Sequence, residues 1–482
     1  MTLLDSKTWS GSLFSGGWIP AAVTAPVTEP ATGDALGRIG LAGAPELATA
    51  AQRAAAAQPA WARTSFEERA AVLRRAGLAF EQHAAEIQEW ITRESGSIRG
   101  KAAFETHVAA QECYEAATLA SRPLGEILPT AKQRLSLARR VPAGVVGVIA
   151  PFNAPLILAI RSVAPALALG NAVLLKPDPR TAVCGGVSIA RVFEEAGLPD
   201  GLLHVLPGGA ETGAALIEHP LVRVISFTGS TATGRRVGEA AARSLKRVHL
   251  ELGGNSAQIV LGDADLDKAV SAGAWGSFFH QGQICMTAGR HLVHASLFEE
   301  YVARLADKAS KLPVGNPFTE DVALGPIIDA AQRDKIHALV SADADRVVTG
   351  GTYEGLFYRP TVLAGLSSGS PVYAEEVFGP VAPVLSFSSL DEAAALASAS
   401  PYGLSLSILT ADAMRGLELA ERIPTGIVHI NDQTVDDEAV APFGGVGASG
   451  TGSRFGGASA NIEAFTETRW ITLQGQIETY PF

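Results

Sequence analysis

Between residues 145 and 261, short runs of apolar and β-branched residues alternate with stretches of helical character. The runs are Val145–Ile149, Ala172–Leu175, Leu202–Leu206, Arg223–Phe227 and Ala257–Leu261. Because these runs are apolar on both faces, both faces must be covered, as in a parallel sheet built from βαβ units. The pattern therefore predicts an α/β fold.

The first 120 residues carry helical periodicity, and we predict that they are mostly helix. Apolar residues recur at steps of three and four over Leu73–Ile91. This spacing predicts one amphipathic helix of several turns. Gly96 follows as the expected stop of that helix.

A second α/β pattern follows Gly254, with helices expected near Leu266–Phe279 and Leu297–Lys311 and strands near residues 346–349 and 381–387. The tail Phe465–Gln474 alternates polar and apolar residues, which predicts a half-buried strand. This strand has no obvious partner in its own chain, so it could pair with another subunit.

Size and composition limit the classes of protein that this chain can belong to. A chain of 482 residues is expected to form two or three domains. Its net charge of −11 comes from intermixed acidic and basic residues, so we expect no nucleic-acid partner. The apolar stretch Val141–Phe152 is short and interrupted by Pro and Gly, so we expect no membrane span. Three scattered cysteines predict neither a disulfide framework nor a metal site, and suit the cytoplasm.

Cys285 lies in the Gly/Gln-rich segment Phe279–Arg290, which we expect at the start of a helix. Backbone N–H groups there would favour the reactive thiolate and could hold an oxyanion formed by its attack on a carbonyl. A lone cysteine is more often a packing residue, and that is what we expect of Cys113 and Cys184 in their Ala/Gly-rich helices. His280, Trp275 and Phe278 near Cys285 are expected to be structural.

Two other residues have the chemistry to assist a nucleophile. Glu251 has apolar neighbours and precedes Gly253 and Gly254, so it could be partly desolvated and act as a general base; the alternative is a solvated glutamate at a strand end. Asn153 lies between Pro151 and Pro155 and could donate a hydrogen bond to an oxyanion. The alternative for Asn153 is an ordinary turn residue.

Two features indicate a nucleotide site. The turn Gly229–Gly234 follows a strand and opens a helix, which suits a phosphate group at a helix N-terminus. Lys176 directly follows a strand, where the crevice of an open α/β sheet lies. Each feature alone is weak, since a plain strand–turn–helix junction and a surface lysine are the better explanations when either is seen alone.

Taken together and in this order, these segments resemble the aldehyde dehydrogenase superfamily almost from end to end. Further markers are Glu376–Pro380 and Pro442–Gly445, followed by Ser449 and Gly450. The resemblance implies a Rossmann-type cofactor domain (residues 1–122 and 143–253) and an α/β catalytic domain (residues 254–462). It also implies a small β oligomerisation arm (residues 123–142 and 463–482) and a homodimer or homotetramer.

The resemblance also implies roles for single residues. Cys285 would be the nucleophile, Glu251 would activate the water that hydrolyses a thioester, and Asn153 with the Cys285 N–H would hold the oxyanion. Other residues would bind the cofactor, NAD or NADP: Pro151, Phe152, Lys176, Pro179, Arg180, Gly229, Ser230, Gly234, Leu252, Glu376 and Phe378.

One departure from the family concerns the choice of cofactor. In relatives that prefer NAD, the third position after the lysine is often a glutamate that accepts the ribose hydroxyls. Here it is Pro179, followed by Arg180. A carboxylate would repel a 2′-phosphate, whereas arginine could pair with it. We therefore expect that NADP is accepted.

The resemblance is strongest to the branch of benzaldehyde and vanillin dehydrogenases, which predicts an aromatic aldehyde as substrate. Phe152, Ile284 and Met286 would line the substrate pocket, a lining that suits a medium-chain aliphatic aldehyde almost as well. A non-redox cysteine hydrolase or acyltransferase would leave the nucleotide features unexplained. Glu251, as a water activator, argues against transfer of the acyl group to coenzyme A.

Overall fold

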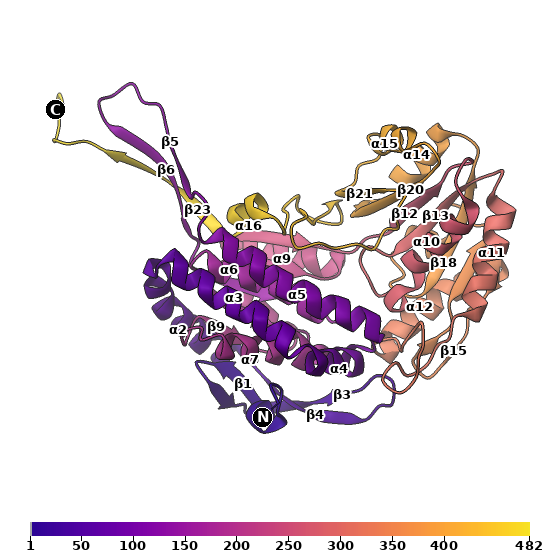
Figure 1. Ribbon diagram of the computed structural model, residues 1–482, viewed down its shortest axis with the longest axis horizontal. Helices are drawn as coiled ribbons and strands as arrows, with labels where there is room; N and C mark the ends of the chain where they lie inside the picture. The colour runs from indigo at the N-terminus through magenta and orange to yellow at the C-terminus, as the bar shows by residue number, and fades with distance from the viewer. Residues whose placement is uncertain (1) are drawn as a thin grey trace.

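The computed structural model describes residues 2–482 and has two lobes, each built on a seven-stranded sheet (Figure 1). The first sheet has the order β11-β10-β7-β8-β9-β1-β2. Five of its strands are parallel: β7 (Val145–Ile149), β8 (Ala172–Lys176), β9 (Leu203–Val205), β10 (Val222–Thr228) and β11 (Arg247–Glu251). The strand order reverses between β7 and β10, which is where open α/β sheets bind ligands beyond the carboxyl ends of their strands.

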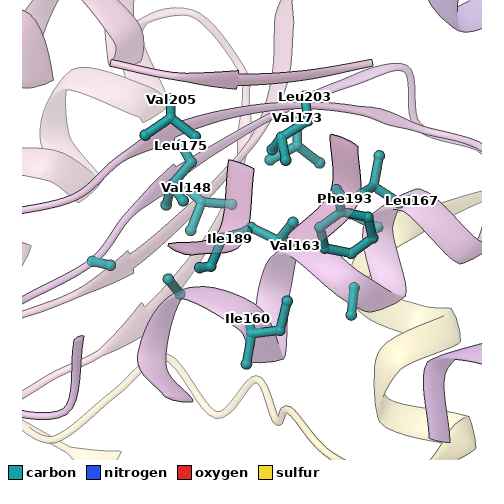
Figure 2. Packing of buried hydrophobic residues seen from close by; sticks show 14 of the residues in the cluster. Val148, Ile160, Val163, Leu167, Val173, Leu175, Ile189, Phe193, Leu203 and Val205 are labelled. Carbon is teal, nitrogen blue, oxygen red and sulfur yellow. The ribbon is translucent and has the colours of Figure 1, made fainter. Parts of the chain in front are cut away.

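Helices cover both faces of this sheet. Figure 2 shows side chains of β7, β8 and β9 directed at α6 (Pro155–Ala168) and α7 (Ser188–Glu195). Behind these helices lie α3 (Phe66–Gln82) and α5 (Arg99–Leu119). The opposite face packs against α2 (Ala44–Arg63), α8 (Ala210–Glu218) and α9 (Thr231–Arg243). All residues of α6 are buried, so its apolar sequence needs no amphipathic stripe.

The second sheet has the order β14-β17-β18-β13-β12-β20-β21, and only β14 (Val347–Thr349) runs antiparallel to its neighbour. Its parallel strands are β12 (Ser256–Val260), β13 (Ala288–His294), β17 (Thr361–Ala364), β18 (Val381–Phe387), β20 (Ser405–Leu409) and β21 (Ile427–Ile430). Alternate residues face opposite cores, with Ile259 in one and Val260 in the other. The covering helices are α10 (Leu266–Phe278), α11 (Phe298–Lys311), α14 (Leu390–Ser398) and α15 (Ala413–Ala420).

A three-stranded antiparallel sheet extends away from both lobes (Figure 1). It consists of β5 (Gly125–Ile127), β6 (Leu135–Pro142) and β23 (Thr466–Leu473), in the order β23-β6-β5. The short helix α16 (Ala458–Phe465) precedes β23 and packs against α5 and α6 of the first lobe. None of the helices in residues 2–482 has the length and the apolar character needed to cross a membrane.

The first 120 residues are mostly helix, as predicted, although β1 (Ser12–Ser15), β2 (Trp18–Pro20), β3 (Val23–Thr28) and β4 (Ala35–Leu41) precede α2. The structure corrects two other expectations about the ends of the chain. The stripe expected to form one helix is divided between α3 and α4 (Ala84–Ser95), which meet at His83. The C-terminal strand β23 pairs with β6 of its own chain and is mostly exposed, so it is neither unpartnered nor half-buried. Gly96 ends α4 in the left-handed conformation, with φ 69°, as predicted.

Candidate active site

Cys285 lies in the loop between a 3₁₀ turn (Phe279–Gly282) and β13, and the nearest preceding helix, α10, ends at Phe278. The expectation that it starts a helix is therefore wrong. His280, Gln281 and Gly282 all have positive φ (50°, 56° and 64°), a conformation that non-glycine residues seldom adopt. The loop that carries Cys285 therefore directly follows a strained turn.

Contacts with distant segments hold this turn in place. The side-chain amide of Gln281 donates to the carbonyl oxygens of Gly96 (2.9 Å) and Pro326 (2.8 Å). A Cβ added to Gly282 would lie 2.0 Å from the carbonyl oxygen of Gly379, so this position requires glycine. Tertiary contacts, and not local propensity, therefore fix the position of the cysteine.

The thiol of Cys285 is protonated in the free protein. Burial, together with the carboxylates of Glu376 and Glu251, raises its pKa to about 12, although the Arg161 guanidinium opposes this shift. The expectation that backbone dipoles favour the thiolate is wrong here, because no helix begins at Cys285. The side chain is still partly exposed, so a substrate can reach the sulfur.

Glu251 is the last residue of β11 and is 2% exposed. Neither carboxylate oxygen has a hydrogen-bond partner among residues 2–482. Burial raises the pKa of Glu251 well above its ordinary value, although the guanidinium groups of Arg161 and Arg454 oppose this shift. The desolvated environment expected of a general base is present.

Asn153 follows β7 and precedes α6, and it is 4% exposed. Its backbone is fixed by a buried ion pair on α5 that the sequence analysis missed. Lys101 Nζ donates to the Asn153 carbonyl oxygen (2.8 Å) and pairs with Glu105. Glu105 in turn accepts from the N–H of Leu156 (2.7 Å) at the start of α6. The available signal was two charges four residues apart on an alanine-rich helix.

A pocket of about 150 Å³ brings residues of both lobes together around Cys285. From the first lobe it is lined by Asn153 and by Leu252 and Gly253, which directly follow Glu251. The second lobe contributes Cys285 and Glu376. Cys285 and Asn153 thus line one pocket at the junction of the two lobes, and Glu251 directly precedes two of its lining residues. Also lining the pocket are Pro151, Phe152, Leu158, Thr228, Gly229, Ser230, Gln332, Lys335 and Phe378.

A second cleft, of about 840 Å³, lies beyond the carboxyl ends of β7, β8 and β10. Ser230 caps α9 by accepting from the N–H of Thr233 (3.3 Å), and the N–H of Gly229 donates to the Glu251 carbonyl oxygen (3.0 Å). Gly234 is in the first turns of α9, where an added Cβ would lie 2.2 Å from Leu252. A close backbone turn at a helix N-terminus suits a pyrophosphate, so these residues fit a dinucleotide. Lining this cleft are Pro151, Phe152, Lys176, Pro179, Arg180, Gly229 and Ser230.

Glu376 lines the smaller pocket, together with Cys285. Its carboxylate accepts from the N–H of Gly254 (2.9 Å), and a Cβ on Gly253 would lie 2.2 Å from it, so glycine is needed for this approach. Burial raises the pKa of Glu376 to about 7. Phe378 has a positive φ of 55° and packs edge-on against Phe152, with ring centroids 5.9 Å apart. These contacts suit the nicotinamide end of a dinucleotide.

Pro179 occupies the position at which NAD-preferring relatives often have a glutamate that accepts the ribose hydroxyls, and Arg180 follows it. The Arg180 guanidinium lies 4.3 Å from the centre of the Phe152 ring and pairs with Asp178 (2.8 Å) and Asp329 (2.5 Å). Its charge is therefore already shared by two carboxylates. Lys176, at the end of β8, is 8% exposed, and burial lowers its pKa.

Cys285 belongs to a cluster of apolar side chains. Ile284 and Met286 belong to this cluster, but neither lines the pocket around Cys285. Phe152 does line that pocket, where it packs against Phe378 and Arg180. The sequence analysis missed the other members, although Phe443 lay in a recognised marker. They are Leu404, Ile427, Val435 and Phe443.

The remaining expectations concern packing residues. Cys113 and Cys184 are fully buried in helical segments, and His280 is fully buried beside Ser97 (3.4 Å), so all three are structural as predicted. Phe278 is in the core, but Trp275 is 49% exposed and stacks on Phe279, so its prediction as a core residue is wrong. Among residues 2–482 no group of three or more histidine, cysteine or acidic side chains could hold a metal ion.

Comparison with known proteins agrees with this geometry. Residues 18–471 match the model of the aldehyde dehydrogenase family. A vanillin dehydrogenase from an Amycolatopsis species is 72% identical to this chain, and the match covers 100% of both chains. A benzaldehyde dehydrogenase from Pseudomonas putida, whose name specifies NAD+, is 49% identical, and the match covers 99% of both chains.

Among solved structures, a salicylaldehyde dehydrogenase from Pseudomonas putida G7, complexed with salicylaldehyde, superposes with a TM-score of 0.94. It is 36% identical, and the match covers 98% of this chain and 99% of that one. Family match, identity and fold agree over nearly the whole chain. The chain therefore belongs to the aldehyde dehydrogenase family and is an NAD(P)-dependent aldehyde dehydrogenase.

Proposed function

We propose that the protein oxidises an aromatic aldehyde to the carboxylic acid through a thioester on Cys285. The observation that carries this proposal is the position of Cys285, which belongs to an apolar cluster and lines a pocket that shares Phe152 and Gly229 with the dinucleotide-sized cleft. The names of the vanillin and benzaldehyde dehydrogenases to which the chain is similar support an aromatic ring in that apolar cluster.

The proposed reaction begins when the Cys285 sulfur attacks the aldehyde carbon and its proton leaves to water. The Asn153 side-chain amide and the Cys285 N–H stabilise the resulting oxyanion. An oxidised nicotinamide held near Glu376 and Phe378 would supply the hydride acceptor that converts this adduct into a thioester on the Cys285 sulfur. Glu251 then takes a proton from a water molecule that attacks the thioester, so that the acid leaves and the thiol is restored.

A matrix of aldehydes and cofactors tests this function. Benzaldehyde and vanillin should each give an equimolar amount of reduced nicotinamide and acid, with kcat/KM above that of hexanal. The apolar cluster also favours a medium-chain aliphatic substrate, since nothing in it requires an aromatic ring. A kcat/KM for hexanal above those of both aromatic aldehydes would overturn the aromatic assignment.

We propose further that NADP is accepted alongside NAD. Pro179 removes the carboxylate that would repel a 2′-phosphate, and Arg180 and Arg236 line the same cleft. Asp178 carries a negative charge there, but it is paired with Arg180. Arg180→Leu should lower kcat/KM for NADP more than for NAD. Absence of any turnover with NADP by the unaltered protein would refute the proposal.

We also propose the three-domain division expected above, with residues 123–142 and 463–482 forming an oligomerisation arm. Ile127, Trp470 and Leu473 on this arm are 78%, 66% and 64% exposed. Exposed apolar side chains of this kind are typical of subunit interfaces. Light scattering should give a dimer or tetramer, and a chain lacking residues 466–482 should give smaller assemblies. A full-length monomer would contradict the proposal.

A further inference from the structure

Arg161, on α6, is a buried cation whose hydrogen-bonding capacity is only partly used. It is 2% exposed, and its Nη2 pairs with Asp437. Its Nε and Nη1 are also buried and have no partner among residues 2–482. Buried donors without an acceptor are costly, so two of them on one guanidinium indicate a missing acceptor.

The guanidinium borders the substrate side of the site. Its central carbon lies 4.5 Å from the centre of the Phe443 ring, and Phe443 belongs to the apolar cluster that contains Cys285. Phe443 and Asp437 also line a neighbouring pocket of about 350 Å³, together with Ile427. Arg161 is therefore a buried cation in contact with the apolar cluster that contains the reactive sulfur.

Neighbouring carboxylates keep this cation charged. Burial alone would lower the pKa of Arg161, but Asp437, Glu112 and Glu251 raise it above its ordinary value. Glu112 is itself 2% exposed on α5. The three carboxyl groups thus stabilise the positive charge of Arg161, while its donors Nε and Nη1 still lack an acceptor.

We propose that Arg161 is a specificity-determining residue whose Nε and Nη1 hydrogen-bond an oxygen substituent on the ring of an aromatic aldehyde. This inference rests on the proposed function. A site built around buried donors discriminates strongly against a substrate that lacks the acceptor, because the donors then stay unpaired. The same guanidinium packs over Phe443, so ring and substituent are recognised side by side.

The test compares benzaldehyde with ortho-, meta- and para-hydroxybenzaldehyde in the unaltered protein and in Arg161→Met. For at least one hydroxybenzaldehyde, kcat/KM relative to benzaldehyde should fall about 10- to 100-fold in the variant, as expected for loss of a hydrogen bond to a charged group. A general electrostatic effect of Arg161 on Cys285 or Glu251 would change all four substrates equally. Ratios that stay unchanged for all three isomers overturn the inference.

Two further variants keep the test decisive. Arg161→Met leaves Asp437 buried without its partner, so the double variant Arg161→Met/Asp437→Leu removes both charges and should give the same loss. Arg161→Lys retains the charge without the planar donor fork and should also lower the ratio. Binding of reduced NAD, measured by fluorescence, reports correct folding. If the unaltered protein does not oxidise benzaldehyde, the proposed function fails; if it does and the ratios are constant, only this inference fails.

Discussion

Replacing Glu251 with glutamine removes a negative charge and a proton acceptor while keeping the shape of the side chain. Glu251 is 2% exposed, and its oxygens accept no hydrogen bond from residues 2–482, so the change leaves no known partner unsatisfied. Other nearby carboxylates are engaged, since Asp437 pairs with Arg161 and Glu376 accepts from Gly254. No described group is therefore placed to replace the lost base.

General-base catalysis contributes about 10²- to 10⁴-fold. Because no substitute is at hand, we expect Glu251→Gln to lower the steady-state rate about 10³-fold, or about 4 kcal/mol in the activation free energy. Formation of the thioester does not need Glu251, so the first turnover should survive. Rapid mixing with excess benzaldehyde and NAD, followed by reduced-nicotinamide absorbance, should give a burst of one equivalent per site and then a slow phase. A steady-state rate within about tenfold of the unaltered protein would refute the reasoning.

Thermal or denaturant unfolding provides the matched control for this variant. The pKa of Glu251 in the folded protein is raised above its ordinary value of 4.5, so its ionisation destabilises the fold. Its contribution to stability is fully present below pH 4.5 and is lost as the pH rises through the raised pKa. Glu251→Gln should therefore be at least as stable as the unaltered protein at pH 8. A marked loss of stability would mean that the kinetic defect reports misfolding.

Three other perturbations test separate parts of the site. Cys285→Ala should abolish aldehyde oxidation and leave the binding of reduced NAD intact; residual turnover above background would contradict it. Because the pKa of Cys285 is about 12, alkylation of the free protein by iodoacetamide should rise about tenfold per pH unit from pH 7 to 10, and a plateau below pH 9 would contradict a neutral thiol. Lys101→Met removes the donor that fixes the Asn153 carbonyl and should lower kcat by about 10²-fold with little change in the KM for NAD. An unchanged kcat would show that Lys101 does not contribute to oxyanion stabilisation.

The sequence was most informative where burial alone determines the pattern. The strand Val145–Ile149 was predicted with its observed bounds, and so was the strand at residues 381–387. Both are central strands with covered faces, so their apolar character is continuous. The strands β1 to β4 carry no such pattern because they lie at a sheet edge or form a separate two-stranded sheet. The break at His83 was invisible because the apolar stripe continues through it.

The candidate site was predicted in its chemical groups but not in its local structure. Cys285, Glu251 and Asn153 lie in recognisable segments, whereas the positive φ angles of His280 and Gln281 depend on contacts with Gly96 and Pro326. Such contacts join segments far apart in the chain, and no local pattern encodes them. For the same reason the contact of Lys101 with Asn153, and the contact of Arg161 with Phe443, could be recognised only in the folded protein.

The account depends most on a covalent bond between the substrate and the sulfur of Cys285. Mixing Glu251→Gln with benzaldehyde and NAD, quenching in acid within one turnover and mapping peptides by mass spectrometry tests this bond directly. We expect a benzoyl group on the peptide that contains Cys285, and no such group when NAD is omitted. A burst of reduced NAD without any acyl group on that peptide, or with the group on another residue, would contradict the mechanism.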